Sequence, residues 1–355
     1  MQTQDTFPIT INKIKASKIK EVDFENLTFG NVFTDYMLSC DYVDGKWNNP
    51  VIEPYGTIEI SPAARVFHYG QAIFEGMKAY RDDNDDVWLF RPEENFKRFN
   101  KSSTRLAIPE IPKEIFMNGL LQLLQMDKAW VPKGYGNSLY IRPFVFGNQV
   151  GVSAAPSANY KFMILLCPVK AYYTGDVKVL IAETYSRAAN GGVGAAKAAG
   201  NYGAQFYPTG LAKEKGYQQI IWTDDCSHQY LEEAGTMNVF FRINDTLITA
   251  PTSDRILDGV TRKSIIALAE HKGIPVEVRK ITVSEVLEAA QNKSLKEIFG
   301  AGTAAVISPV SGFGYKDDHF DLEPLDDSYA KLLKKSLLDI QYNLADDPFG
   351  WRMKV

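Results

Sequence analysis

A chain of 355 residues is longer than a single hydrophobic core usually supports, so we expect two domains. Hydrophobic residues make up 45% of the sequence and charged residues 23%, which is typical of a soluble globular protein. The formal net charge is -4 and no long basic run occurs, so the sequence argues against a nucleic-acid-binding protein and favours small-molecule partners.

The first half of the sequence predicts β-hairpins, then helices, then two longer strands. Turn residues separate the apolar runs of the hairpins, and a proline opens each predicted helix. The predicted elements are hairpins over 36–47 and 72–90, helices over 92–107 and 112–131, and strands over 138–146 and 160–169.

In the second half, predicted helices alternate with strands. The strands are 177–183, 218–224, 238–245, 246–250 and 276–282, and the helices are 201–215, 261–271 and 327–346. This change of pattern indicates a boundary near residues 170–180. We therefore predict an α+β protein with a small domain over 1–170, a linker over 171–180 and a larger domain over 181–355. We expect the active site between the two domains.

The sequence also predicts a compartment. The first ten residues, MQTQDTFPIT, lack the basic and then apolar order of a secretory signal, and the longest apolar stretch, 162–169, is too short to span a bilayer. The cysteines Cys40, Cys167 and Cys226 are odd in number and far apart, which is typical of reduced thiols. We expect a cytoplasmic protein that makes no membrane contact.

One lysine lies in a run of small residues, VGAAKAAGNYG, over 193–203. Lys197 is either an ordinary solvated charge in a loop or a lysine whose small neighbours make room for a flat molecule that its amine holds covalently. A phosphate-binding P-loop requires glycine before the lysine and serine or threonine after it. Because Ala196 and Ala198 occupy these positions, we exclude a nucleoside triphosphatase of that type.

Two adjacent glutamates, Glu232 and Glu233, lie in the stretch YLEEAGTMNVFF. In an extended segment their side chains point to opposite sides, so one can enter a pocket while the other meets solvent. A buried carboxylate needs a cationic partner, and a protonated pyridine nitrogen would serve. The alternative is that both acids lie in a solvated turn.

Six motifs together resemble one family. They are HYGQAIFEGMKAY, LYIRP, GGVGAAKAAGNYG, LEEAGTMN, LDGVTRKSI and FGAGTAAVISPV. From about residue 30 to the carboxy-terminal helix, the chain resembles the branched-chain amino acid aminotransferases of the pyridoxal-phosphate fold-type IV group. The resemblance implies a two-domain fold like that of D-amino acid aminotransferase, pyridoxal 5'-phosphate as cofactor, and a homodimer.

The implied reaction moves the amino group of leucine, isoleucine or valine to 2-oxoglutarate, giving branched 2-oxo acids and L-glutamate by a ping-pong route. Within the same fold, a D-amino acid aminotransferase or an aminodeoxychorismate lyase is the alternative, and either would share Lys197 and Glu233. Tyr140, Arg142 and the segment GTMN favour the branched-chain activity. A cofactor-free binding or scaffold protein is the alternative from another class.

The resemblance also implies roles for individual residues. Lys197 would hold the cofactor covalently and later move a proton at the substrate α-carbon, Glu233 would face the pyridine nitrogen, and Tyr202 would contact the ring oxygen. Other implied cofactor ligands, mainly of the phosphate, are Arg98, Thr236, Val260, Thr261 and Thr303. No metal site is predicted.

The implied substrate pocket accepts both apolar and acidic side chains. Its aromatic walls would be Tyr69, Phe74, Tyr140 and Tyr172. Arg142 lies two residues after Tyr140, hence on the same strand face, and would bind the distal carboxylate of 2-oxoglutarate. Ala304 and the Thr236 region would meet the α-carboxylate.

Overall fold

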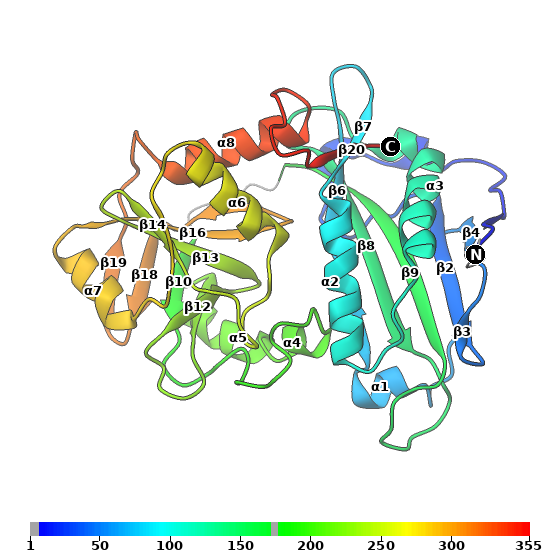
Figure 1. Cartoon of the computed structure of the whole chain (residues 1–355), viewed down its shortest axis with the longest axis horizontal. Helices are drawn as coiled ribbons and strands as arrows, with labels where there is room; N and C mark the ends of the chain where they lie inside the picture. The colour runs from blue at the N-terminus through cyan, green and yellow to red at the C-terminus, as the bar shows by residue number, and fades with distance from the viewer. Residues whose placement is uncertain (1–6, 172–176) are drawn as a thin grey trace, which may run out of the picture. The chain divides into compact units, whose positions relative to one another are not determined.

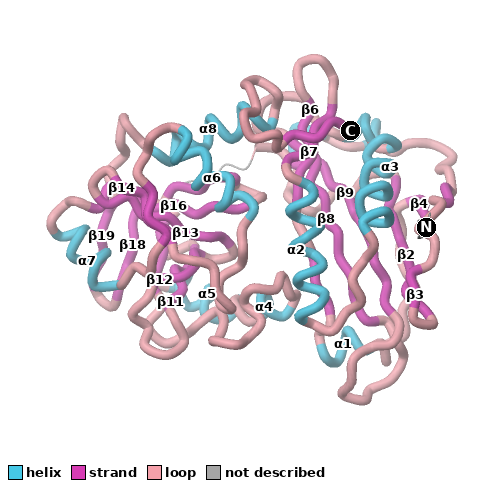
Figure 2. Tube along the Cα trace, in the orientation of Figure 1, coloured by secondary structure: helices cyan, strands magenta, loops and turns pink. Residues whose placement is uncertain are grey.

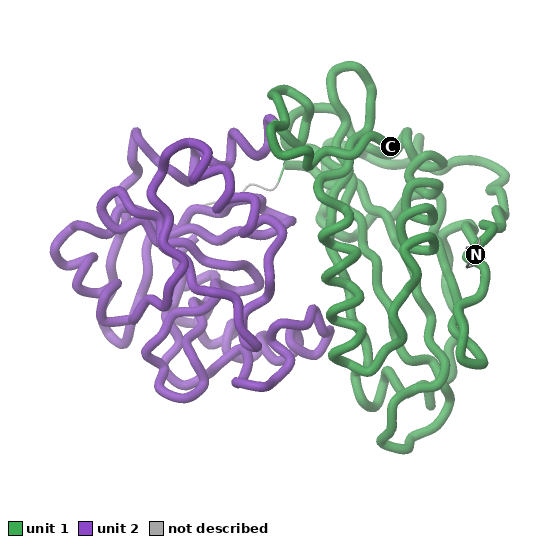
Figure 3. Tube along the Cα trace, in the orientation of Figure 1, with its two compact units in different colours: residues 1–172, 340–355 green, residues 173–339 purple. Residues whose placement is uncertain are grey.

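The chain divides into two units, each built on its own β-sheet (Figure 3). Unit 1 comprises residues 1–172 and 340–355, and unit 2 comprises residues 173–339. The computed structural model describes residues 7–171 and 177–355. The sequence assigned residues 340–355 to the second domain, but they belong to unit 1, because β20 (Arg352–Lys354) pairs with β7 (Val87–Phe90).

The sheet of unit 1 is mostly antiparallel, with strand order β1-β4-β2-β9-β8-β6-β7-β20 and with β3 on β2 and β5 on β8 (Figure 1). Its other strands are β1 (Thr10–Ile11), β2 (Tyr36–Val43), β3 (Lys46–Trp47), β4 (Val51–Pro54), β5 (Ala72–Phe74), β6 (Met77–Arg81), β8 (Ser138–Gly147) and β9 (Tyr160–Val169). The hairpins and long strands predicted from the sequence are confirmed. The β8–β9 ladder pairs all ten residues of each strand, so it fixes the register of the residues that β8 carries.

Helices α2 (Pro92–Arg105) and α3 (Gly119–Met126) cover one face of this sheet (Figure 2), while α1 (Arg65–Tyr69) is a short helix before β5. Pro92 opens α2 and acidic residues occupy its first turn, and both features favour the start of a helix here. The single helix predicted over 112–131 is wrong. The segment forms a π-helical turn over Glu114–Asn118, then α3, then a 3-10 turn over Lys128–Trp130.

The sheet of unit 2 has strand order β15-β14-β13-β12-β11-β10-β18-β19, and β16 pairs with β13 and β17. Its strands are β10 (Lys178–Ile181), β11 (Gln219–Thr223), β12 (Leu231–Ala234), β13 (Met237–Ile243), β14 (Thr246–Thr249), β15 (Val276–Val278), β16 (Leu295–Gly302), β17 (Val306–Pro309), β18 (Gly312–Tyr315) and β19 (Asp318–Asp321). The core beside it is built from inward residues such as Ile181, Ile221 and Phe241.

The helices of unit 2 connect these strands. They are α4 (Gly200–Gly203), α5 (Phe206–Glu214), α6 (Val260–His271), α7 (Val283–Gln291) and α8 (Tyr329–Gln341), whose last two residues belong to unit 1. The predicted helix over 201–215 is divided into α4 and α5, and α7 was not predicted. Over the described residues, each helix is too short or too polar to cross a membrane.

Candidate active site

Lys197 follows a glycine-rich turn and lies three residues before the start of α4. Its Nζ donates a hydrogen bond to the Tyr202 hydroxyl at 2.7 Å, and the two flanking alanines are buried. The Asn201 side chain holds the turn by donating to the carbonyls of Val193 and Ala196, at 2.9 and 3.0 Å. The small residues therefore pack inward, and the half-buried amine is held beside a tyrosine hydroxyl.

Glu233 lies on β12 and is buried. Its Oε2 contacts Arg187 Nε at 2.5 Å, and its Oε1 accepts from Asn238 Nδ2 at 3.0 Å and from the Leu257 N–H at 3.2 Å. Burial raises the pKa of Glu233 to about 7, and the positive charges of Arg187 and Lys197 oppose this rise. Burial therefore favours the protonated carboxyl, while the two nearby cations favour the carboxylate.

The neighbouring acid, Glu232, does not meet solvent, so that part of the expectation is wrong. Only 5% of Glu232 is exposed, and its Oε1 contacts Arg255 Nε at 2.5 Å. Arg255 also pairs with Asp225 at 3.1 Å. Burial raises the pKa of Glu232 and Arg255 opposes the rise. The two glutamates do point apart, but each meets an arginine instead of water.

The start of α6 offers backbone donors for an anion. Val260 and Thr261 form its first turn, no described side chain caps this end, and Gly259 precedes it in an extended conformation. A Cβ on Gly259 would lie 1.9 Å from Asn238 Oδ1, so only glycine fits here. Because Asn238 also binds Glu233 and the Leu257 carbonyl, the helix start is tied to the buried acid.

Arg98 lies on α2 in unit 1 and is buried against a carboxylate. Its Nε and Nη2 donate to the two oxygens of Glu75 at 2.6 and 2.9 Å, in the bidentate geometry that arginine and carboxylate favour. Asn95 Nδ2 donates to Glu75 Oε2 at 2.8 Å. The guanidinium is therefore fixed on the helix by a buried ion pair.

On β8, Tyr140 and Arg142 occupy one face of the strand. Arg142 Nη2 donates to the Tyr140 hydroxyl at 2.9 Å, and its guanidinium lies 4.6 Å from the centre of the Phe74 ring. Arg142 Nε is buried and has no hydrogen-bond partner within the described residues. A cation with an unused donor beside two aromatic rings suits a carboxylate ligand.

Three comparisons with known proteins identify the family. A family model described as amino-transferase class IV matches residues 72–313. The chain belongs to the class IV aminotransferases. A probable branched-chain-amino-acid aminotransferase of Staphylococcus epidermidis is 45% identical over 350 residues, which cover 96% of this chain and 97% of that protein.

Branched-chain-amino-acid aminotransferase 2 of Bacillus subtilis is 42% identical over 358 residues, covering 99% of this chain and 98% of that one. Among solved structures, the branched-chain amino acid aminotransferase of Thermobaculum terrenum in its PLP form matches with a TM-score of 0.72 and 19% identity, covering 91% of this chain and 98% of that one. The family and the fold-type IV architecture expected from the motifs are confirmed.

In this class IV aminotransferase, the predicted site residues form separate groups. Phe74, Arg98, Tyr140 and Arg142 lie in unit 1, and Lys197, Tyr202, Glu233, Val260 and Thr261 lie in unit 2. Thr303 and Ala304 follow β16 and are half-buried, and Thr236 is exposed in the turn after β12. Tyr69 is 46% exposed at the end of α1, where its hydroxyl donates to the Val152 carbonyl. Tyr172 lies outside the described residues.

Sequence reasoning missed Arg187, Arg255 and Glu75. Glu75 lies within the motif HYGQAIFEGMKAY, but no role was assigned to it, and the two arginines lie outside the six motifs. One physical signal pointed toward the arginines: a glutamate that enters the interior needs a cation. The need of a buried glutamate for a cation suggested the pyridine nitrogen as the partner of Glu233. An arginine of the protein itself satisfies the same need.

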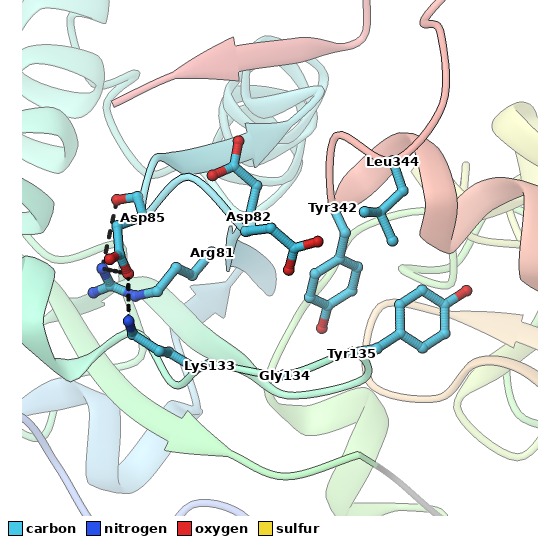
Figure 4. Close-up of a pocket in the computed structure, with 9 residues that line it drawn as sticks. Arg81, Asp82, Asp85, Lys133, Gly134, Tyr135, Tyr342 and Leu344 are labelled. Atoms are coloured by element: carbon cyan, nitrogen blue, oxygen red, sulfur yellow. Dashed lines mark hydrogen bonds and ion pairs between the residues drawn. The ribbon is translucent and has the colours of Figure 1, made fainter.

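Two pockets of unit 1 involve none of the predicted residues. The pocket in Figure 4 has a volume of about 140 Å³, and Asp85 in it pairs with Arg81 at 3.4 Å and Lys133 at 2.8 Å. Arg81 and Lys133 also line a second pocket, of about 490 Å³. In the second pocket, Lys170 pairs with Glu25. The charges of the two pockets are therefore engaged in ion pairs, and neither pocket indicates chemistry. Over residues 7–171 and 177–355, histidine, cysteine and acidic side chains form no cluster that could hold a metal ion.

Proposed function

We propose that this class IV aminotransferase transfers the amino group of leucine, isoleucine or valine to 2-oxoglutarate, with pyridoxal 5'-phosphate as its cofactor. The observation that carries the proposal is the pairing of the Lys197 amine with the Tyr202 hydroxyl, in the same unit as the buried Glu233. The identity of 45% to a protein named as a probable branched-chain-amino-acid aminotransferase supports the substrate class.

The donor set fits pyridoxal phosphate. A lysine amine, a buried carboxylate and a phenol hydroxyl match the aldehyde, the pyridine nitrogen and the ring oxygen. The start of α6 has the backbone N–H groups that would suit a phosphate dianion, and Gly259 allows Asn238 to pack directly against this helix start. Arg98 would be the arginine ligand of the phosphate. When bound, the cofactor supplies an electron sink for negative charge at the substrate α-carbon.

The chain would contribute binding, orientation and proton transfer. Lys197 would hold the cofactor covalently and, once released by the incoming amine, move a proton at the α-carbon of the substrate. Tyr202 would orient the Lys197 amine through their hydrogen bond of 2.7 Å. Glu233, as a carboxylate, would stabilise a proton on the ring nitrogen.

The two substrates would share one binding surface on unit 1. The rings of Phe74 and Tyr140 suit the apolar side chain of a branched-chain amino acid. Arg142 suits the distal carboxylate of glutamate or 2-oxoglutarate, because its Nε is buried without a partner in the described residues. A site of this kind would serve both half-reactions of a ping-pong cycle, with Arg142 engaged in only one of them.

The test is a set of half-reactions on the purified protein. We expect visible absorbance from lysine-bound pyridoxal phosphate, which L-leucine, L-isoleucine, L-valine and L-glutamate should bleach in a single turnover. Lys197→Ala, which removes the amine, should remain folded by circular dichroism and lack this absorbance. Bleaching by D-amino acids alone would indicate a D-amino acid aminotransferase, and a wild-type protein that takes up no cofactor would refute the proposal.

We further propose that the protein acts as a homodimer. Four exposed apolar residues of unit 1 support this assembly: Phe67, Tyr69, Val150 and Val152 are 60%, 46%, 63% and 64% exposed. The Ala64–Val150 bridge brings α1 and the 148–153 loop together, so these residues form one apolar surface. Light scattering should give the mass of a dimer for the wild type and a smaller mass for Val152→Asp. A monomeric wild type would refute the assembly.

The proposed compartment is the cytoplasm. Cys40 and Cys167 are buried free thiols and Cys226 is an exposed one. Reduced thiols are the usual state of cysteine in a cytosolic protein.

A further inference from the structure

The buried side chain of Arg187 connects Glu233 to two loops of unit 2. The Arg187 and Glu233 side chains are 7% and 5% exposed, and Arg187 Nε lies 2.5 Å from Glu233 Oε2. Arg187 Nη2 also donates to the Gly194 carbonyl at 3.1 Å and to the Arg255 carbonyl. Gly194 belongs to the turn that leads into Lys197, so one guanidinium fixes the buried acid relative to the loop of the proposed cofactor lysine.

The carboxylate of Glu233 can accept one more hydrogen bond, and its existing hydrogen bonds indicate which of its two oxygens would accept it. Oε1 accepts from Asn238 and from the Leu257 N–H, whereas Oε2 accepts from Arg187. A carboxylate oxygen accepts about two hydrogen bonds, so the remaining capacity is on Oε2. A ring N–H directed at Glu233 would therefore share Oε2 with Arg187.

Charges around Glu233 act in both directions. Burial disfavours the carboxylate, Glu232 adds like charge, and Arg187 and Lys197 add positive charge. Arg262 also interacts electrostatically with Glu233 and with Asp258. Arg187 Nε lies 2.5 Å from Glu233 Oε2, so this cation attracts the carboxylate at contact distance.

We propose that Arg187 is a positioning residue that keeps Glu233 ionised, so that the proton shared by Glu233 and the pyridine nitrogen stays on the nitrogen. This inference rests on the proposed function. A cation in contact with Oε2 stabilises the carboxylate strongly and opposes a proton on the more distant nitrogen weakly. Without Arg187, Glu233 would take the proton from the ring nitrogen, and the charged pair would become a neutral pair that burial favours.

Substitutions at Arg187 separate its charge from its hydrogen bonds. Arg187→Met removes both the charge and the hydrogen bonds, so the pKa of Glu233 should rise. Each pKa unit of this rise changes the ratio of protonated to ionised Glu233 by a factor of about ten. Arg187→Lys keeps the positive charge and loses the fork that reaches the two carbonyls. Arg255→Met is the matched control, because it removes the arginine of the neighbouring pair with Glu232 and leaves the Arg187–Glu233 contact.

The measurement is the ¹⁵N resonance of the ring nitrogen in protein loaded with ¹⁵N-labelled pyridoxal phosphate. We expect the protonated position for the wild type, Arg187→Lys and Arg255→Met, and a shift toward the unprotonated position for Arg187→Met. An Arg187→Met resonance equal to that of the wild type would overturn the inference and leave the proposed function standing. A wild type that takes up no labelled cofactor would overturn both.

A second measurement needs no substitution at Arg187 and no cofactor. The infrared difference between the cofactor-free wild type and Glu233→Gln reports the protonation state of Glu233 directly. At pH 8 we expect a carboxylate band with Arg187 in place. A protonated carboxyl band in that difference spectrum would overturn the inference even if Arg187→Met failed to fold.

Discussion

Replacing Arg142 with alanine should separate the two half-reactions. In the proposed function, Arg142 binds the distal carboxylate of glutamate, and leucine has no such group. The structure supports this selectivity, because Arg142 Nε is a buried donor without a partner in the described residues, while Nη2 is already bonded to Tyr140. An unused donor on this cation suits the one substrate that carries a second carboxylate.

The size of the effect follows from the surroundings of the guanidinium. Truncating one partner of a buried charge pair costs about 2 to 5 kcal/mol. Arg142 is half-buried, so we expect the lower part of this range, about 2 to 3 kcal/mol, or a loss of about 30- to 150-fold for glutamate. For leucine, the loss should be the contact with the Phe74 ring, about 0.5 to 1 kcal/mol, which is a factor of about two to five.

Stopped-flow absorbance of the cofactor measures each half-reaction separately as kcat/KM. Arg142→Lys is the matched control, because it keeps the charge without the planar fork and should lose less activity toward glutamate than alanine does. Tyr140→Phe removes only the hydroxyl that orients the guanidinium. Equal losses for glutamate and leucine in Arg142→Ala would refute the assignment of Arg142 to the distal carboxylate.

Three further outcomes are expected. In Gly76→Ala the new Cβ would lie 2.3 Å from the Tyr140 hydroxyl, so Tyr140 should move and the KM for glutamate should rise, as steady-state kinetics would detect. Burial raises the pKa of Asp127 from 3.8 to about 7. The native state therefore retains a proton that the unfolded chain releases, and wild-type stability should fall by up to about 4 kcal/mol between about pH 4 and pH 7. Asp127→Asn should weaken this fall in unfolding midpoints. Burial raises the pKa of Cys40 to about 12 and of Cys167 to about 11, so these two thiols should resist mild peroxide. Cys226 is exposed but is not among the proposed site residues, so activity should stay unchanged in a standard assay.

Each of these expectations has a contrary result. An unchanged KM in Gly76→Ala would mean that the Tyr140 hydroxyl does not orient the substrate site. A stability profile of Asp127→Asn that falls as steeply with pH as that of the wild type would assign the dependence to another group. Loss of activity after peroxide that a dithiol reverses would reveal an oxidisable thiol that controls the reaction.

The parts of the fold that the sequence predicted are those with a local signal. The strands β8 and β9 are long and rich in β-formers, and α2 begins at a proline and carries a periodic apolar face. Strand β20 has no such signal, because three residues at the end of the chain form a strand only by pairing with β7. Pairing across most of the sequence length cannot be deduced from local periodicity.

The broken helix of unit 1 has a similar cause. The apolar pattern over 112–131 continues without interruption, and a single helix was the natural prediction. In the structure, a Cβ on Gly119 would lie 2.5 Å from Leu38 Cδ1, so the chain approaches strand β2 closely where α3 begins. The π-helical turn precedes this glycine. Tertiary packing therefore decides a boundary that propensity alone does not mark.

In the proposed site, the sequence indicated Lys197 and Glu233 as candidates but did not indicate which residues surround them. Strand alternation correctly placed Glu232 and Glu233 on opposite sides. It could not predict that the loop around Arg255 covers the Glu232 side, since that loop is distant in sequence and carries no motif. The pattern of a strand fixes the direction of its side chains, whereas burial depends on what packs above them.

The arginines of the proposed site differ in one respect that bears on substrate exchange. Arg98 and Arg187 are each held by a buried glutamate, so their charges are compensated within the protein and their positions are fixed before any ligand binds. Arg142 contacts the Tyr140 hydroxyl and the rings of Phe74 and Tyr140, and no carboxylate of the described residues pairs with it. A ping-pong transaminase must accept a neutral side chain in one half-reaction and a carboxylate in the other. Arg142, which has no carboxylate partner among the described residues, is therefore suited to the substrate side chain, which changes between the half-reactions. Arg98 and Arg187, which are paired with glutamates, are suited to the cofactor, which is present in both.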